Sequence, residues 1–201
     1  MPATAPNLPR RFARALARTL FGLLWLALLA LGALWAWRQP FMERPRTLWE
    51  LSRMPPPATL PVPVQSVAPR QVADTFGAPR GADRRHEGVD IFAPRGTPVT
   101  STTRGVVVAI NDRGLGGRQV WVLGPAGERH YYAHLDGFAP GIARFDLVEA
   151  GGLLGFVGDT GNARGTPPHL HYGIYAMSGA YNPWPLLQAG AKQAPGSQPG
   201  R

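Results

Sequence analysis

Cysteine is absent from the 201-residue sequence. Its absence excludes disulfide bonds, cysteine-ligated zinc and thiol nucleophiles. It does not identify the compartment, because a chain without thiols suits oxidising and reducing surroundings alike. Two further catalytic patterns are missing, namely the Gly-x-Ser-x-Gly turn of serine hydrolases and a phosphate-binding loop with a lysine.

Acidic residues are scarce, and the formal net charge is +9. The excess lies mostly near the N-terminus, where residues 1–69 contain eight arginines and two acidic residues. Residues 70–190 contain eleven arginines and ten acidic residues, so this part of the chain is almost neutral. We therefore expect no basic face on the folded domain and no nucleic-acid partner.

One long hydrophobic run is present, at residues 19–37, and it carries no charged residue. Its 19 residues are about the number that a helix needs to cross a bilayer core. The alternative is a cleaved signal peptide, but the run is longer than a usual signal core, and Trp35 and Trp37 occupy the expected cleavage zone. We predict an uncleaved transmembrane anchor, preceded by a basic tail at residues 1–18 in the cytoplasm.

The segments on either side of the central region are predicted to lie outside the folded domain. Residues 38–65 are interpreted as a juxtamembrane linker, because residues 54–64 contain five prolines and favour an extended spacer. Residues 188–201 are polar and rich in Gly and Pro, which predicts a disordered tail. Four arginines lie on each side of the hydrophobic run, so the positive-inside rule does not decide its orientation.

Residues 66–187 are predicted to form one mainly β domain. Short runs rich in Val, Ile and Tyr alternate with Gly, Pro, Asp and Asn, which indicates an antiparallel sheet with tight turns. No stretch of this region has the periodicity of an amphipathic helix.

The first candidate site segment contains His86 and Asp90, with Gly88 between them. Residues four apart on a straight strand are separated by about 13 Å, too far for both to bind one ion. A helix would bring them together, but Gly88 and Pro94 disfavour a helix, so we expect the chain to bend at Gly88.

Two further segments place histidines at strand spacing. His169 and His171 are two residues apart, so their side chains share a face while Leu170 points into the core. Tyr132 and His134 share a face if their strand is regular. Taken alone, either pair is also compatible with ordinary strand histidines.

Together these segments resemble the lysostaphin-like family of zinc metalloendopeptidases, which have the duplicated-hybrid-motif fold. The resemblance covers about residues 75–185. Its motifs are Phe76-Gly77-Ala78-Pro79-Arg80, His86-x-Gly88-x-Asp90, Ala93-Pro94-Arg95-Gly96-Thr97-Pro98-Val99, Tyr132-x-His134-Leu135, Gly155-x-Val157-Gly158-x-Thr160-Gly161, Pro168-His169-Leu170-His171-Tyr172 and Asn182-Pro183.

The resemblance implies a role for each matching position. His86, Asp90 and His171 match the zinc ligands, and His134 and His169 match the catalytic histidines. Tyr132 stands where the family often has a tyrosine, which suggests a substrate or oxyanion contact. The chain departs from the family at Gly173, a position that is often acidic, and in the compact loop at residues 114–127.

The implied function is a zinc-dependent endopeptidase that hydrolyses peptide cross-links of bacterial peptidoglycan with a zinc-bound water and two catalytic histidines. Three protein ligands leave a fourth zinc position for that water. The alternative is a catalytically silent wall-binding module that localises or activates another hydrolase. In either case we expect a single-pass protein of the cytoplasmic (inner) membrane whose domain faces the periplasm or cell wall, with an antiparallel sheet that forms a substrate groove.

Overall fold

The computed structural model describes residues 10–81 and 83–193 and divides into two units, residues 1–46 and 47–201. The first unit contains helix α1 (Arg10–Trp37). Among the described residues, one helix is long and apolar enough to cross a membrane, over Phe12–Trp37, and none of its window is buried. It ends at the residue where the predicted span ends. Length and composition of this kind fit an anchor and a signal sequence equally.

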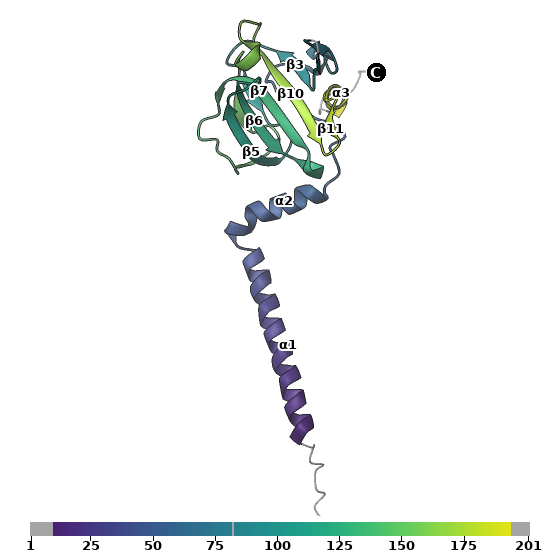
Figure 1. Ribbon diagram of the computed structural model, residues 1–201, viewed down its shortest axis with the longest axis vertical. Helices are drawn as coiled ribbons and strands as arrows, with labels where there is room; N and C mark the ends of the chain where they lie inside the picture. The colour runs from purple at the N-terminus through teal and green to yellow at the C-terminus, as the bar shows by residue number, and fades with distance from the viewer. Residues whose placement is uncertain (1–9, 82, 194–201) are drawn as a thin grey trace, which may run out of the picture. The chain divides into compact units, whose positions relative to one another are not determined.

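The second unit is built on a nine-stranded sheet in which every pairing is antiparallel. The central order is β11-β10-β7-β6-β5-β8, with β3 also paired to β10 and β9 paired to β4 and β7 (Figure 1). A separate hairpin joins β1 to β2. The strands are β1 (Pro79–Arg80), β2 (Arg84–Arg85), β3 (Val89–Phe92), β4 (Pro98–Thr100), β5 (Gly105–Asp112), β6 (Arg118–Leu123), β7 (Arg129–Phe138), β8 (Leu147–Val148), β9 (Leu153–Val157), β10 (His169–Ala176) and β11 (Gly179–Tyr181). The predicted mainly antiparallel β fold with one N-terminal apolar helix is confirmed.

The core of this unit consists of the strand residues that the sequence marks as apolar. Alternate positions of β6 and β10 point inward, and Val120, Val122, Leu170 and Ile174 are fully buried. Their burial removes the β-branched and leucine side chains from water, which is the main favourable contribution to folding. His169 and His171 alternate with these core residues, so they lie on the opposite face of β10.

The proline-rich segment differs from the predicted spacer, because it packs against the domain. Leu60 and Val64 are only 2% and 1% exposed and belong to the hydrophobic core. The Leu60 amide donates a 3.0 Å hydrogen bond to the Leu186 carbonyl, and Val64 forms a β-bridge with Val99. The extended backbone that the prolines favour is therefore used for pairing, and the boundary predicted at residue 66 lies too far toward the C-terminus.

Two helices pack against the domain, and each buries a leucine there. The residues of α2 (Glu43–Arg53) from Thr47 onward belong to the second unit, and Leu51 is buried there. Helix α3 (Trp184–Gln193) continues past residue 187 into the part predicted to be disordered. Close contact explains its course, since a Cβ at Gly190 would lie 2.3 Å from the Leu60 carbonyl oxygen. The remainder of the predicted tail, residues 194–201, lies outside the described residues, as do residues 1–9 of the basic tail.

A buried polar cluster joins β7 and β10 to the loop after β4. The Thr102 hydroxyl lies 2.9 Å from the hydroxyls of both Tyr132 and Tyr172, and the Thr102 amide donates to Tyr132 at 2.9 Å. His130 Nδ1 lies 2.8 Å from the Tyr172 hydroxyl. His130 is fully buried, and burial lowers its pKa to about 4 because the charged imidazolium is poorly solvated there.

His130 makes the free energy of unfolding depend on pH. Its pKa is about 4 when folded and near 6.5 when unfolded, so the unfolded chain binds the extra proton between these values. Stability is then full above about pH 6.5, falls as the pH drops, and levels off below about pH 4, with a total loss of about 3 kcal/mol. We expect His130→Gln, which keeps a polar group but cannot titrate, to flatten the curve by this amount in urea unfolding with metal chelated. Identical pH slopes for wild type and variant would contradict the assignment.

Candidate metal centre and cleft

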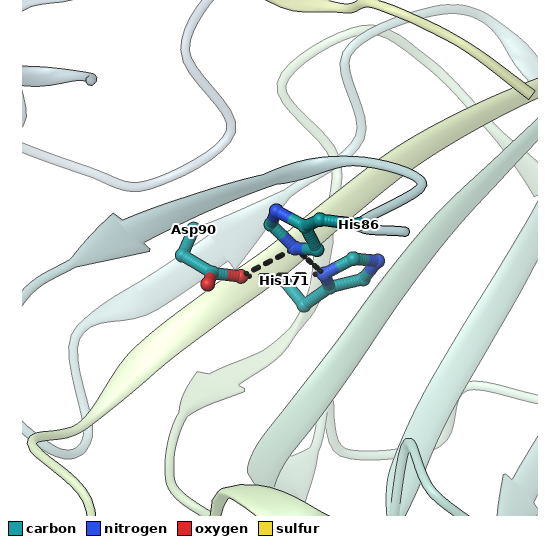
Figure 2. A group of neighbouring side chains, drawn as sticks. All are labelled: His86, Asp90 and His171. Carbon is teal, nitrogen blue, oxygen red and sulfur yellow. Dashed lines mark hydrogen bonds and ion pairs between the residues drawn. The ribbon is translucent and has the colours of Figure 1, made fainter. Parts of the chain in front are cut away.

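Three predicted ligands come together on one face of the sheet. The ligand atoms of His86, Asp90 and His171 all lie within 4.8 Å of one another. His86 Nε2 is 2.8 Å from His171 Nδ1, and the two nitrogens are 3.1 Å and 3.2 Å from Asp90 Oδ1. Figure 2 shows the two imidazoles and the carboxylate pointing toward a common centre. In a tetrahedral zinc site with bonds of about 2.0 Å, ligand atoms are separated by roughly 3.3 Å, so this donor set fits a metal ion.

Strand register and one bend bring these residues together. Asp90 on β3 pairs directly with His171 on β10, so the two side chains are neighbours across the ladder. His86 precedes a bend at Gly88, as the sequence predicted, and this bend returns its imidazole to the same centre. A Cβ at Gly88 would lie 2.4 Å from the Tyr172 carbonyl oxygen and 2.8 Å from His171 Cε1, so glycine is required there.

Hydrogen bonds from the surrounding residues leave the candidate ligand atoms able to bind a metal ion. His86 Nδ1 donates to the Thr75 carbonyl at 2.8 Å, which leaves Nε2 as the lone-pair nitrogen facing the centre. Burial disfavours the charged form of Asp90, but the contacts of its carboxylate with His171, His86 and Arg80 outweigh this effect and hold the pKa of that carboxyl well below its usual range. Burial also lowers the pKa of His171, against the effect of its contact with Asp90. The centre therefore combines two imidazoles with an ionised carboxylate.

Arg80 was not singled out by the sequence as a site residue, although it lies in a family motif. Its guanidinium donates to Asp90 Oδ2, while Oδ1 faces the two histidines. The two carboxylate oxygens thus have different partners, which fixes the orientation of the carboxylate.

His134 and His169 lie beside the candidate metal centre, and both rings bond to a backbone carbonyl through the same nitrogen. His134 Nδ1 donates to the Thr160 carbonyl and His169 Nδ1 to the Pro167 carbonyl, each at 2.8 Å. A carbonyl can only accept, so Nδ1 carries a proton in both rings. The His134 ring centre is 5.2 Å from that of His169 and 5.9 Å from that of His171. Burial, together with the neighbouring His171, lowers the pKa of His134 to about 4.

A β-bulge turns His134 toward the cleft. Between the pairs Val120↔Tyr132 and Arg118↔Leu135, one residue of β6 faces two residues of β7. His134 has a φ of 64°, in the left-handed region, and its amide donates to the Gly116 carbonyl at 2.9 Å. The strand is therefore irregular at this histidine, which breaks the alternation of faces.

The bulge overturns the expected role of Tyr132. That side chain is fully buried and its hydroxyl binds Thr102, so it does not face the cleft. The cleft-facing residue is Tyr131, whose ring centre lies 5.6 Å from that of His171. The expectation assumed that residues 132 and 134 share a face of a regular strand, and the left-handed conformation of His134 removes that condition.

The cleft has a volume of about 550 Å³, and both aromatic and charged side chains line it. Trp121 stacks on Tyr131 at 4.2 Å between ring centres, and Tyr175 lies 5.3 Å from Trp121, which forms an aromatic wall. Gly173 leaves room for this wall, because a Cβ there would lie 3.1 Å from Tyr175 Cε2 and 2.7 Å from the Glu87 carbonyl oxygen. Three arginines, Arg80, Arg84 and Arg85, also line the cleft, and the other lining residues include loop positions 115, 116, 162, 163 and 166.

Gly88 provides a test of the ligand geometry. We expect Gly88→Ala to lower the affinity for Zn²⁺ by about 10–100-fold, because its methyl group would displace His171 or the β10 backbone. Gly137→Ala is the matched control, since no heavy atom of the described chain lies within 4 Å of the corresponding Cβ position. Competition titration with a fluorescent zinc chelator measures both affinities. Equal affinity in the two variants would show that Gly88 does not set the position of His171.

Comparison with known proteins gives consistent matches over this domain. The sequence profile of peptidase family M23 matches residues 84–183. The chain is 42% identical over 126 residues to the L-Ala–D-Glu endopeptidase of Bacillus subtilis, covering 57% of this chain and 39% of that protein. The chain thus spans about two fifths of the length of this curated relative.

Two solved structures are similar to the domain. The catalytic domain of the antimicrobial peptidase lysostaphin from Staphylococcus simulans has a TM-score of 0.52 and 32% identity, covering 58% of this chain and 91% of that domain. A zinc containing peptidase from Vibrio cholerae has a TM-score of 0.53 and 26% identity, covering 61% of this chain and 38% of that one.

The profile match begins at β2 and ends just after β11, so it encloses His86, Asp90 and His171. The lysostaphin domain is matched over nearly its whole length. These matches confirm the resemblance that the motifs indicated, and the chain belongs to peptidase family M23.

Proposed function

We propose that this chain is a zinc-dependent endopeptidase that hydrolyses peptide cross-links of bacterial peptidoglycan. The observation that carries the proposal is the His86–Asp90–His171 group, flanked within 6 Å by His134 and in contact with His169 through Asp90. A silent binding module would not need two further histidines held in one tautomer beside the ligands.

Zinc is the metal that suits this group best. Two imidazoles and one carboxylate are the ligand types of catalytic zinc sites, which keep a further position open. The similarity to a zinc containing peptidase supports the same choice. Bound zinc would supply Lewis-acid chemistry, polarising the scissile carbonyl and making a water molecule acidic enough to lose a proton near neutral pH.

His134 and His169 are proposed to move the protons of the reaction. The lowered pKa of His134 keeps its imidazole neutral at neutral pH, with Nε2 available to accept a proton. A histidine that has accepted a proton can then donate it to the amine leaving group. The backbone carbonyls of Thr160 and Pro167 keep both rings oriented while this happens.

The substrate is proposed to be a stem or bridge peptide of peptidoglycan. The open cleft with its aromatic wall can accept an extended peptide, and the relatives act on such bonds by name, for example L-Ala–D-Glu. We further propose that α1 remains as a single membrane anchor and that the domain faces the periplasm or cell wall. The substrate and the apolar helix are the arguments that support this placement.

Ligand and catalytic variants should separate metal binding from turnover. We expect His86→Ala, Asp90→Ala and His171→Ala to lose most of their zinc, because each removes one of three ligands. His134→Ala and His169→Ala should keep zinc but lose turnover by about 10²–10⁴-fold, the usual contribution of a positioned proton-transfer group. Metal analysis and peptide release from the same preparations measure both effects. Full zinc in His171→Ala, or near-normal rates in both catalytic-histidine variants, would contradict these roles.

Digestion of purified peptidoglycan tests the reaction itself. We expect cross-linked muropeptide dimers to fall and monomers to rise on mass spectrometry, with glycan chain length unchanged. His134→Ala protein is the control for adventitious hydrolase. Binding to peptidoglycan without any change in muropeptides would instead identify a silent wall-binding module.

A further inference from the structure

The part of helix α2 that belongs to the second unit has two chemically different faces. Thr47 and Leu51 are only 3% and 1% exposed, and they face the domain. Glu50 is fixed on the same side, because its carboxylate accepts a 3.0 Å bond from Arg104. Arg104 also reaches the Thr47 hydroxyl at 3.4 Å. This side of the helix is therefore occupied by the domain.

The remaining face, which we call the outer face, consists of Leu48, Trp49 and Arg53. Leu48 is 39% exposed and Trp49 54%. At about 100° per residue, Trp49 points roughly 160° away from Leu51, so the packed side cannot accommodate it. The Arg53 guanidinium carbon lies 5.3 Å from the centre of the Trp49 ring. Two large apolar side chains and a cation thus lie within six residues at exposed positions of the helix.

This combination has the chemistry of a membrane interface. Tryptophan is enriched at the headgroup level, where its ring is partly apolar and its N–H can reach water. Interfacial helices combine such residues with arginines that attract anionic lipids. The sequence between α1 and the end of α2 contains four arginines, at positions 38, 44, 46 and 53, and two acidic residues. Of these two, Glu50 is already paired with Arg104, so the segment keeps a net positive charge against Glu43 alone.

Chain connectivity places this face close to a bilayer if α1 is a membrane span. Only nine residues, 38–46, separate the end of α1 from Thr47. Fully extended they could cover at most about 35 Å, and part of them is helical, which shortens the distance. The outer face is therefore confined to the neighbourhood of the membrane surface, and residues 54–64 add no free length because Leu60 and Val64 are buried in the domain.

We propose that the outer face of α2 docks the domain on the membrane surface, with anionic phospholipid headgroups as the partner. The proposal rests on the proposed role of α1 as an anchor. Leu48 and Trp49 enter the interface, and Arg53 binds lipid phosphate. The packed face of α2 transmits this contact to the domain, so the cleft is held in a defined position relative to the bilayer.

The absence of cysteine allows single-site labelling of the full chain. A nitrobenzoxadiazole fluorophore on Ser52→Cys reports on the outer face and leaves its three residues intact. Met177→Cys is the aqueous control, because Met177 is fully exposed at the turn between β10 and β11. Leu24→Cys, within α1, is the membrane control. Each protein is reconstituted in vesicles of phosphatidylethanolamine and phosphatidylglycerol, with and without brominated lipid.

We expect brominated lipid to quench the labels at residues 24 and 52 but not at 177. Adding Leu48→Gln and Trp49→Gln, or omitting phosphatidylglycerol, should reduce quenching at 52 and leave quenching at 24 unchanged. A quenched label at 24 with a water-like label at 52 would overturn the docking proposal alone. A label at 52 that is shielded from water but not quenched would show a protein partner instead and would also overturn it. A water-like label at 24 would overturn both the anchor and the docking.

Discussion

Strand β10 lies between β3 and β7, and its register with both determines the site. His171 faces Asp90 on one side and Ala133 on the other. Because side chains alternate along a strand, a slip of one residue would turn His171 into the core and bring Leu170 or Tyr172 to the surface. The buried cluster opposes such a slip, since Tyr132 and Tyr172 are cross-strand partners and their hydroxyls bind the same threonine, Thr102. Polar groups in the core therefore fix the geometry of polar groups on the opposite face.

The five histidines have different environments, which differ in the hydrogen-bond partners of the ring nitrogens. His86, His134 and His169 each donate from Nδ1 to a backbone carbonyl, which leaves Nε2 of each ring for other partners. His171 differs because its Nδ1 faces the centre and Asp90. His130 lies on the other side of the sheet and bonds to Tyr172. Since backbone carbonyls cannot titrate, they keep these tautomers over a wide pH range, which a carboxylate partner would not.

Sequence patterns predicted the sheet, the bend at Gly88 and the shared face of His169 and His171. They succeeded where local rules determine the outcome, because the period of a strand and the freedom of glycine do not depend on distant residues. They did not predict the left-handed conformation of His134, which depends on the Gly116 carbonyl. The prolines of residues 54–64 were interpreted correctly as extended but wrongly as unpacked, because their partners at Val99 and Leu186 are distant in sequence. Arg80 and Tyr131 became recognisable as site residues only when the hairpin and the bulge were placed.

The loop at residues 114–117 lines part of the cleft and also holds the backbone of His134 in place. Leu115 lines the cleft, while the next residue, Gly116, accepts the His134 amide hydrogen bond. The Leu115 carbonyl also accepts from Asn162, and Gly117 packs against Gly161 so closely that neither has space for a Cβ. The wall of the cleft and the position of His134 are thus mechanically coupled through a few backbone bonds. Exchange of this loop between homologous domains would therefore preserve the position of His134 only if the turn around residue 161 were transplanted with it, which limits how freely evolution or engineering can vary one without the other.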